Sequence, residues 1–143
     1  MALPTHVLVA DASRARFFLR DGADLNEIDD LVCPQARLKE QALDADKPGA
    51  DRGRHPMPSK SSNREQVMRS FAKQTADRFT ELIRDREGCL SAIVAPPRML
   101  GLIRSRLGGG LSERVQWCFD KDYSRFSVRE IDAALRELIN SQR

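Results

Sequence analysis

Two short apolar runs set the architecture that this chain can adopt. His6 to Ala10 and Cys89 to Ala95 contain almost no polar residue, and each is the length of a strand. Such runs are typical of strands in a sheet that is covered on both faces. The sequence therefore predicts an α/β protein in which helices lie on both sides of a central sheet.

The segments between these runs predict the remaining strands. After the turn-rich residues 11–14, strands are expected at Ala15 to Arg20 and at about Leu25 to Cys33, and Asp21-Gly22 is typical of the hairpin turn between them. With His6 to Ala10 they form an antiparallel meander. A fifth strand is expected at Val115 to Phe119.

Helices are expected to separate the later strands. Ser62 to Glu65 has the pattern of a capping box, and apolar residues then recur at helical spacing up to Gly88. Pro97 suits the first turn of a short helix, and a second capping box, Ser127 to Glu130, opens the last helix. Right-handed crossovers then give a five-stranded mixed sheet of order 3-2-1-4-5 with helices on both faces, a ribonuclease H-like three-layer arrangement.

A long loop at about residues 44–62 interrupts this single domain of residues 1–143. Charge is also uneven: residues 1–46 hold five basic and nine acidic side chains (net −4), whereas residues 47–114 hold fourteen and seven (net +7). A basic middle favours phosphate-bearing partners, and the alternative is a solvated helix face with a solvated loop. The candidate phosphate- or RNA-binding residues are Arg52, Arg54, His55, Lys60 and Arg64.

A second group of candidates follows the predicted parallel strands, whose carboxyl ends lie along one edge of the sheet, where α/β proteins tend to bind ligands. These candidates are Asp11, Ser13, Arg14, Arg98, Asp120 and Asp122. A two-metal nuclease needs several carboxylates at this edge, but Arg98 supplies a cation after the fourth strand, so we expect no metal. The structural alternative is that Asp11 or Asp120 pairs with Arg98 or caps a local turn.

Other patterns limit the function further. The cysteines (Cys33, Cys89 and Cys118) are odd in number and match neither a disulfide framework nor a zinc site, so we expect buried free thiols in a reducing cytoplasm. No run of about 18 apolar residues and no signal-peptide pattern is present. The sequence thus predicts a cytoplasmic protein without cofactor or membrane contact.

Four segments resemble a bacterial family called host attachment proteins, described as required for attachment to host cells. They are Val7 to Phe18, Asp46 to Gly49 with the following Arg52 to Arg54, Ala95 to Arg104, and Lys121 to Ser124. The resemblance covers nearly the whole chain. It is most specific in the Pro-Pro-Arg-x-Leu-Gly segment at residues 96–101.

The resemblance implies a relation to the middle domain of the archaeo-eukaryotic peptide-chain release factor, a ribonuclease H-like module. There, a Gly-Gly-Gln loop precedes the long first helix and promotes ester hydrolysis in the peptidyl-transferase centre. The loop at about 44–62 stands in the equivalent place, but no Gln occurs between Gln41 and Gln66. The resemblance therefore implies contact with RNA or the ribosome more than peptidyl-tRNA hydrolysis.

Three functions remain as hypotheses. The first is a release-factor-like domain that contacts the ribosome or tRNA through its basic loop. The second is a non-enzymatic interaction module, expected as a homodimer, that affects host-cell attachment indirectly. The third is a hydrolase of esters or nucleic acids that uses Asp11 with Asp120 or Asp122. Because the sequence shows no nucleophile motif, it favours a protein without enzymatic activity.

Overall fold

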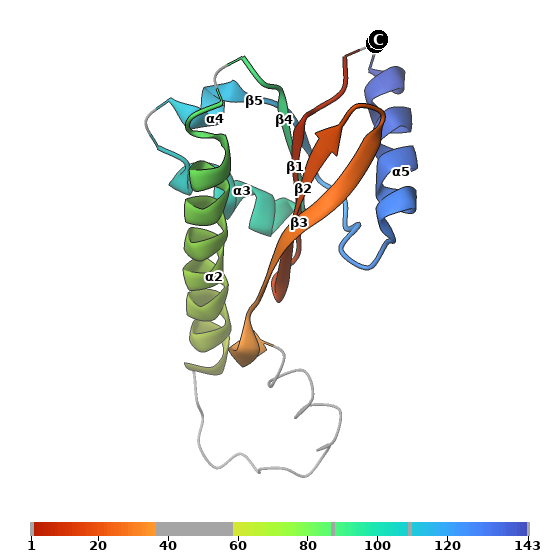
Figure 1. Cartoon of the computed structure of the whole chain (residues 1–143). Coiled ribbons are helices and arrows are strands. Elements are labelled where there is room, and N and C mark those ends of the chain that lie inside the picture. The colour runs from red at the N-terminus through yellow and green to blue at the C-terminus, as the bar shows by residue number, and fades with distance from the viewer. Residues whose placement is uncertain (1, 37–58, 87, 109, 143) are drawn as a thin grey trace.

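The computed structural model describes residues 2–36, 59–86, 88–108 and 110–142 (Figure 1). The elements in chain order are β1 (His6–Ala10), β2 (Arg14–Asp21), β3 (Asp24–Val32), α2 (Ser59–Ile83), β4 (Ser91–Val94), α3 (Pro97–Arg106), α4 (Leu111–Arg114), β5 (Val115–Phe119) and α5 (Val128–Ser141). The strands form one sheet of order β3-β2-β1-β4-β5. Strand β1 is antiparallel to β2 and parallel to β4, which in turn is parallel to β5. The predicted α/β class, strand order and mixed sheet are confirmed.

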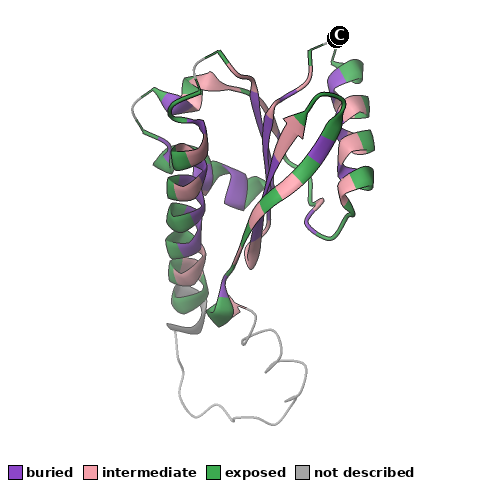
Figure 2. Ribbon diagram, viewed as in Figure 1, coloured by how far each residue is buried: buried purple, intermediate pink, exposed green. Residues whose placement is uncertain are grey.

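The sheet lies between two helical layers, with α2 and α3 on one face and α5 on the other (Figure 1). Successive side chains of β1 point to opposite faces. Leu8 therefore packs with Phe71 of α2 and Ile103 of α3, whereas Val7 packs with Ile131 of α5. Figure 2 shows the result as buried residues along the central strands and along the sheet-facing sides of the helices.

The start of α2 differs from the sequence prediction. The helix begins at Ser59, so the prediction that Ser62 is its N-cap is wrong, and residues 59–62 belong to the helix instead of the loop. Glu65, which a capping box would direct back to the cap, pairs with Arg69 one turn later and with Arg98 of α3. Because the helix begins three residues before Ser62, this serine does not stand at the N-terminus, and Glu65 pairs with the two cations instead.

The second capping box is confirmed at the start of α5. Ser127 Oγ accepts a hydrogen bond from the backbone N–H of Glu130 at 3.1 Å, and Glu130 Oε1 accepts one from the backbone N–H of Ser127 at 2.8 Å.

No helix in the described part of the chain is long and apolar enough to cross a membrane.

The three cysteines are free, but only Cys33 is fully buried. Cys118 is half-buried, because β5 forms an edge of the sheet. The expectation that all three are buried is therefore wrong for Cys89 and Cys118.

His6 is a titratable residue inside the core at the start of β1. It is 2% exposed, and its Nδ1 atom has no hydrogen-bond partner among the described residues. Burial and, to a smaller extent, the nearby charge of Arg86 lower the pKa of His6 from its ordinary value of 6.5. The neutral imidazole is therefore the form that the folded protein favours.

This buried imidazole predicts an acid sensitivity. The unfolded chain binds a proton at His6 near pH 6.5 and the folded protein only at lower pH, so the free energy of unfolding should fall as the pH drops below about 6.5, until the folded-state pKa is passed. His6→Leu should remove this contribution. Urea unfolding of both proteins between about pH 7.5 and 5 measures it. If the two proteins lose stability equally with falling pH, His6 is not responsible.

Candidate functional site

Asp11 organises the turn that follows β1. Its Oδ1 atom accepts hydrogen bonds from the backbone N–H groups of Ser13 and Arg14, both at 2.8 Å. The Ser13 hydroxyl donates to the same oxygen at 3.2 Å. This arrangement is the one by which Asp side chains stabilise turns through the backbone a few residues on. Asp11 thus caps a local turn, and the Arg14 side chain is directed to Asp30 at 3.2 Å.

Ser124 connects Asp11 to the segment after β5. The Ser124 hydroxyl lies 2.6 Å from Asp11 Oδ2 and 2.8 Å from Asp122 Oδ1. A serine hydroxyl has one proton, so it can donate to only one of these carboxylates at a time. The structure therefore brings together two predicted residues, Asp11 and Asp122, through a third that sequence reasoning did not select. Asp120 is exposed and has no hydrogen bond or ion pair within the described ranges.

A buried arginine fixes the position of Ser124. Arg16 of β2 is 6% exposed, and its Nη1 donates to the carbonyl oxygens of Ser124 at 3.0 Å and Phe126 at 2.6 Å. Its Nε and Nη2 atoms donate to the two carboxylate oxygens of Glu27 at 3.1 and 2.8 Å. Sequence reasoning missed this residue. The available signal is a charge inside an otherwise apolar strand, which requires a buried partner.

The contacts at this edge give it a structural role. The carboxylate of Asp11 is engaged by protein donors through both oxygens, and Ser124 is 2% exposed. Within the described ranges, no group of three or more His, Cys, Asp or Glu side chains is placed to hold a metal ion. The cluster is suited to joining the end of β1 to the segment between β5 and α5.

Arg98 does not belong to this cluster. The suggestion that it pairs with Asp11 or Asp120 is wrong, because Arg98 pairs with Glu65 of α2. Pro97 and Arg98 begin α3, whose buried residues Met99 and Ile103 belong to the core cluster that α2 and the sheet share. The start of α3 is therefore turned toward α2.

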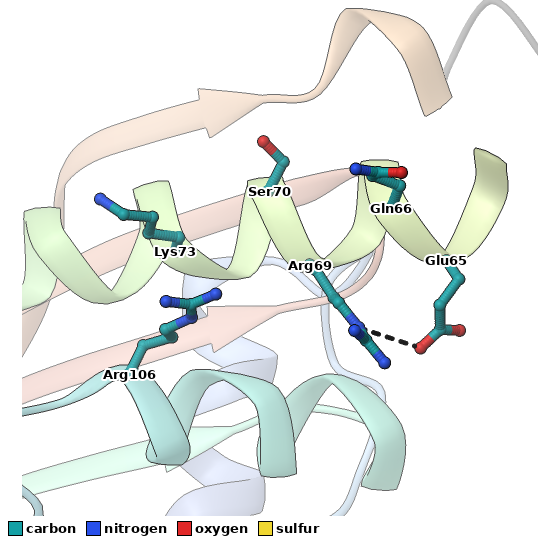
Figure 3. Close-up of a pocket in the computed structure, with 6 residues that line it drawn as sticks. All are labelled: Glu65, Gln66, Arg69, Ser70, Lys73 and Arg106. Atoms are coloured by element: carbon teal, nitrogen blue, oxygen red, sulfur yellow. Dashed lines mark ion pairs between the residues drawn. The ribbon is translucent and has the colours of Figure 1, made fainter. Parts of the chain in front are cut away.

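A hollow of about 500 Å³ lies between α2 and α3 (Figure 3). Its lining residues are Glu65, Gln66, Arg69, Ser70, Lys73 and Arg106. The five from α2 form two rows of residues four apart, Glu65-Arg69-Lys73 and Gln66-Ser70, which lie next to each other on one side of the helix. Arg69 extends from α2 into the space between the helices, and Arg106 reaches from the last turn of α3 toward α2 (Figure 3).

Positive charge exceeds negative charge in and beside this hollow. Glu65 forms ion pairs with two arginines. Its Oε2 atom lies 3.4 Å from Arg69 Nε, and the carboxylate also pairs with Arg98. Lys73 pairs with Asp77 at 2.9 Å, and both of these side chains are exposed. Arg106 has no carboxylate partner within the described ranges. Sequence reasoning selected none of the lining residues, although basic residues four apart on a helix were a usable signal.

The predicted basic loop adjoins α2 in sequence. Arg52, Arg54 and His55 lie outside the described residues, as does the side chain of Lys60. Arg64 is exposed on α2, immediately before Glu65. Of the predicted phosphate-binding residues, Arg64 is thus the one whose side chain the structure describes, and it is not among the lining residues of the hollow.

Comparison with known proteins places these features in a family. A family model described as protein required for attachment to host cells matches residues 6–135 of the 143-residue chain. No curated protein matches the chain. The matched span runs from β1 into α5 and includes both the sheet-edge cluster and the hollow.

The bonds of Asp11 predict a measurable contribution to stability. Asp11→Ala removes the acceptor for two backbone N–H groups and for Ser124, and should lower the free energy of unfolding by about 2 kcal/mol. Asp120→Ala is the matched control and should change it by less than about 0.5 kcal/mol. Chemical denaturation measures both. Equal effects of the two substitutions would show that the Asp11 contacts do not stabilise the fold.

Proposed function

This chain belongs to the family of proteins required for attachment to host cells, and we propose that within this family it acts as an RNA-binding protein. The family description names an outcome and no chemistry, so the chemistry has to be inferred from the residues. The observation that carries the proposal is the excess of basic over acidic residues along α2, five against three, and in the lining of the hollow beside it, three against one.

The position of the positive charge supports RNA as the partner. Residues 47–114 hold a net charge of +7, and they include the segment before α2, α2 itself and α3. Binding of a polyanion releases condensed counterions, and this term supplies most of the affinity of nonspecific complexes. Arginine donates in a planar fork that matches two phosphate oxygens. Arg52, Arg54 and Arg64 therefore form the proposed contact together with Arg69 of α2.

The resemblance to the release-factor middle domain supports the ribosome or tRNA as the source of RNA. In that domain, the segment before the long first helix is the part that enters the ribosome. Residues 44–58 precede α2 in the same way and hold Arg52, Arg54 and His55, with Lys60 in the first turn of the helix. The strand order expected for a ribonuclease H-like module supports the same relation. Since the Gly-Gly-Gln sequence is missing, we propose binding without peptidyl-tRNA hydrolysis.

The proposal predicts salt-sensitive binding that depends on the segment before α2. Wild-type protein should bind tRNA and ribosomes with an affinity that falls linearly with salt concentration on logarithmic axes. In Arg52→Ala/Arg54→Ala, binding should be weaker, and the slope should be smaller by about 0.7 to 0.9 for each phosphate that the variant no longer neutralises. Fluorescence anisotropy for tRNA and cosedimentation for ribosomes measure the two partners.

Arg125→Ala/Arg129→Ala is the matched control, because it removes two exposed arginines from the segment after β5 and the start of α5. This variant should bind as the wild type does. Equally weakened binding in both double variants would indicate a general effect of net charge. No binding by the wild-type protein would reject the proposal and favour the protein-interaction hypothesis.

A further inference from the structure

We infer that the hollow between α2 and α3 is a phosphate clamp, in which the guanidinium groups of Arg69 and Arg106 hold one phosphate ester group. The inference deepens the proposed function and depends on it for the choice of RNA as the ligand. The proposed position of the phosphate follows from the hollow and does not depend on which ligand carries it. A nucleic-acid backbone and a free nucleotide offer the same chemistry, and the experiment below distinguishes them.

The lining of the hollow holds more positive than negative side chains, which favours binding of an anion. Arg69, Arg98 and Arg106 stand beside a single lining carboxylate, that of Glu65. Glu65 is shared by the first two, and Arg106 is left without a carboxylate partner within the described ranges. Two guanidinium groups that enter one space from separate helices repel each other. A phosphate between them would remove this repulsion and accept hydrogen bonds from both.

Core packing fixes the relative position of the two helices that carry these arginines. Met99 and Ile103 of α3 are buried in the same cluster as Phe71 and Ala72 of α2, so the two helices cannot move apart without exposing apolar surface. Arg69 lies two residues before Phe71, and Arg106 lies three residues after Ile103. The hydrophobic contact therefore fixes the backbone from which both arginines extend, so only their side chains have to be ordered when the ligand binds.

The size of the hollow indicates a ligand larger than a single phosphate ion. Its volume of about 500 Å³ lies within the range of sites that bind small organic molecules. The Ser70 hydroxyl and the Gln66 amide are uncharged polar groups in its lining, which can hydrogen-bond a sugar or a base. Lys73 is exposed and pairs with Asp77 on the surface, a type of pair that contributes little and can be exchanged for a phosphate contact. Gln66 and Ser70 lie on the side of α2 away from α3 (Figure 3), so a nucleotide unit whose phosphate lies between Arg69 and Arg106 would extend across α2 to reach them.

The test compares Arg106→Ala with Arg104→Ala. Both residues are exposed, both lie in the last turn of α3, and both substitutions remove one positive charge, but only Arg106 lines the hollow. The probes are a short single-stranded oligoribonucleotide with a 5′-phosphate, the same oligomer with a 5′-hydroxyl, and adenosine monophosphate. Arg106→Ala should weaken binding about tenfold or more, and Arg104→Ala less than about threefold. Arg106→Lys should lie between wild type and Arg106→Ala, because it keeps the charge and loses the fork.

The pattern across the probes identifies the source of the phosphate. An Arg106 effect on both oligomers indicates the backbone, an effect on the phosphorylated oligomer alone indicates the terminal group, and an effect on the mononucleotide indicates a free nucleotide. Equally weakened binding in Arg106→Ala and Arg104→Ala overturns the clamp. Circular dichroism and thermal melting establish that each variant is folded.

The outcomes also separate the clamp from the proposed function. If RNA binding depends on Arg52 and Arg54 and not on Arg106, the RNA contact stands and the clamp is wrong. If the mononucleotide binds in an Arg106-dependent way while RNA does not bind, the clamp stands and the RNA contact is wrong. If the folded wild-type protein binds none of the probes, the clamp is wrong, and if it also binds neither tRNA nor ribosomes, the RNA contact is wrong as well.

Discussion

The complete burial of strand β1 is the constraint on which the rest of the structure depends. Its side chains alternate between two hydrophobic clusters, one shared with α2 and α3 and the other with α5. Its backbone pairs with β2 on one side and with β4 on the other. Both candidate sites take their position from this strand. The hollow lies between the two helices that cover one face of β1, and the cluster around Asp11 lies where the strand ends.

Two groups of arginines in the described part of the chain occupy chemically different environments. Arg16 is buried, and its donors are matched by the Glu27 carboxylate and two backbone carbonyls. Removal of either partner from such a pair costs several kcal/mol, so the role of Arg16 is structural. Arg69 and Arg106 line an open hollow, and a single carboxylate, that of Glu65, lies among its lining residues. Arg16 thus has protein acceptors for its donors, whereas Arg106 has no carboxylate partner among the described residues.

The same Ser-x-x-Glu pattern forms a capping box at the start of α5 and does not form one at the start of α2. Ser127 and Glu130 bond reciprocally, and Glu130 has no ion pair with any of the described residues. Glu65 has the same spacing from Ser62, but it faces cations from its own helix and from α3. Sequence therefore predicted the existence of α2 correctly and its first residue wrongly. The apolar stripe that predicts a helix depends on residues close in sequence. The ion pair of Glu65 with Arg98 depends on a segment more than thirty residues away.

The sequence by itself determined the order of the elements, because strand and helix patterns depend on neighbours within a few residues. It also determined the sheet order, because the short turns between the first three strands and the right-handed crossovers between the later ones leave few alternatives. Only the tertiary structure decided which side chains meet. Ser124 reaches Asp11 across 113 positions of the chain, and Arg106 enters the same hollow as Arg69. Neither contact can be predicted from the residues that neighbour it in sequence, because each depends on how the helices and the sheet pack against one another.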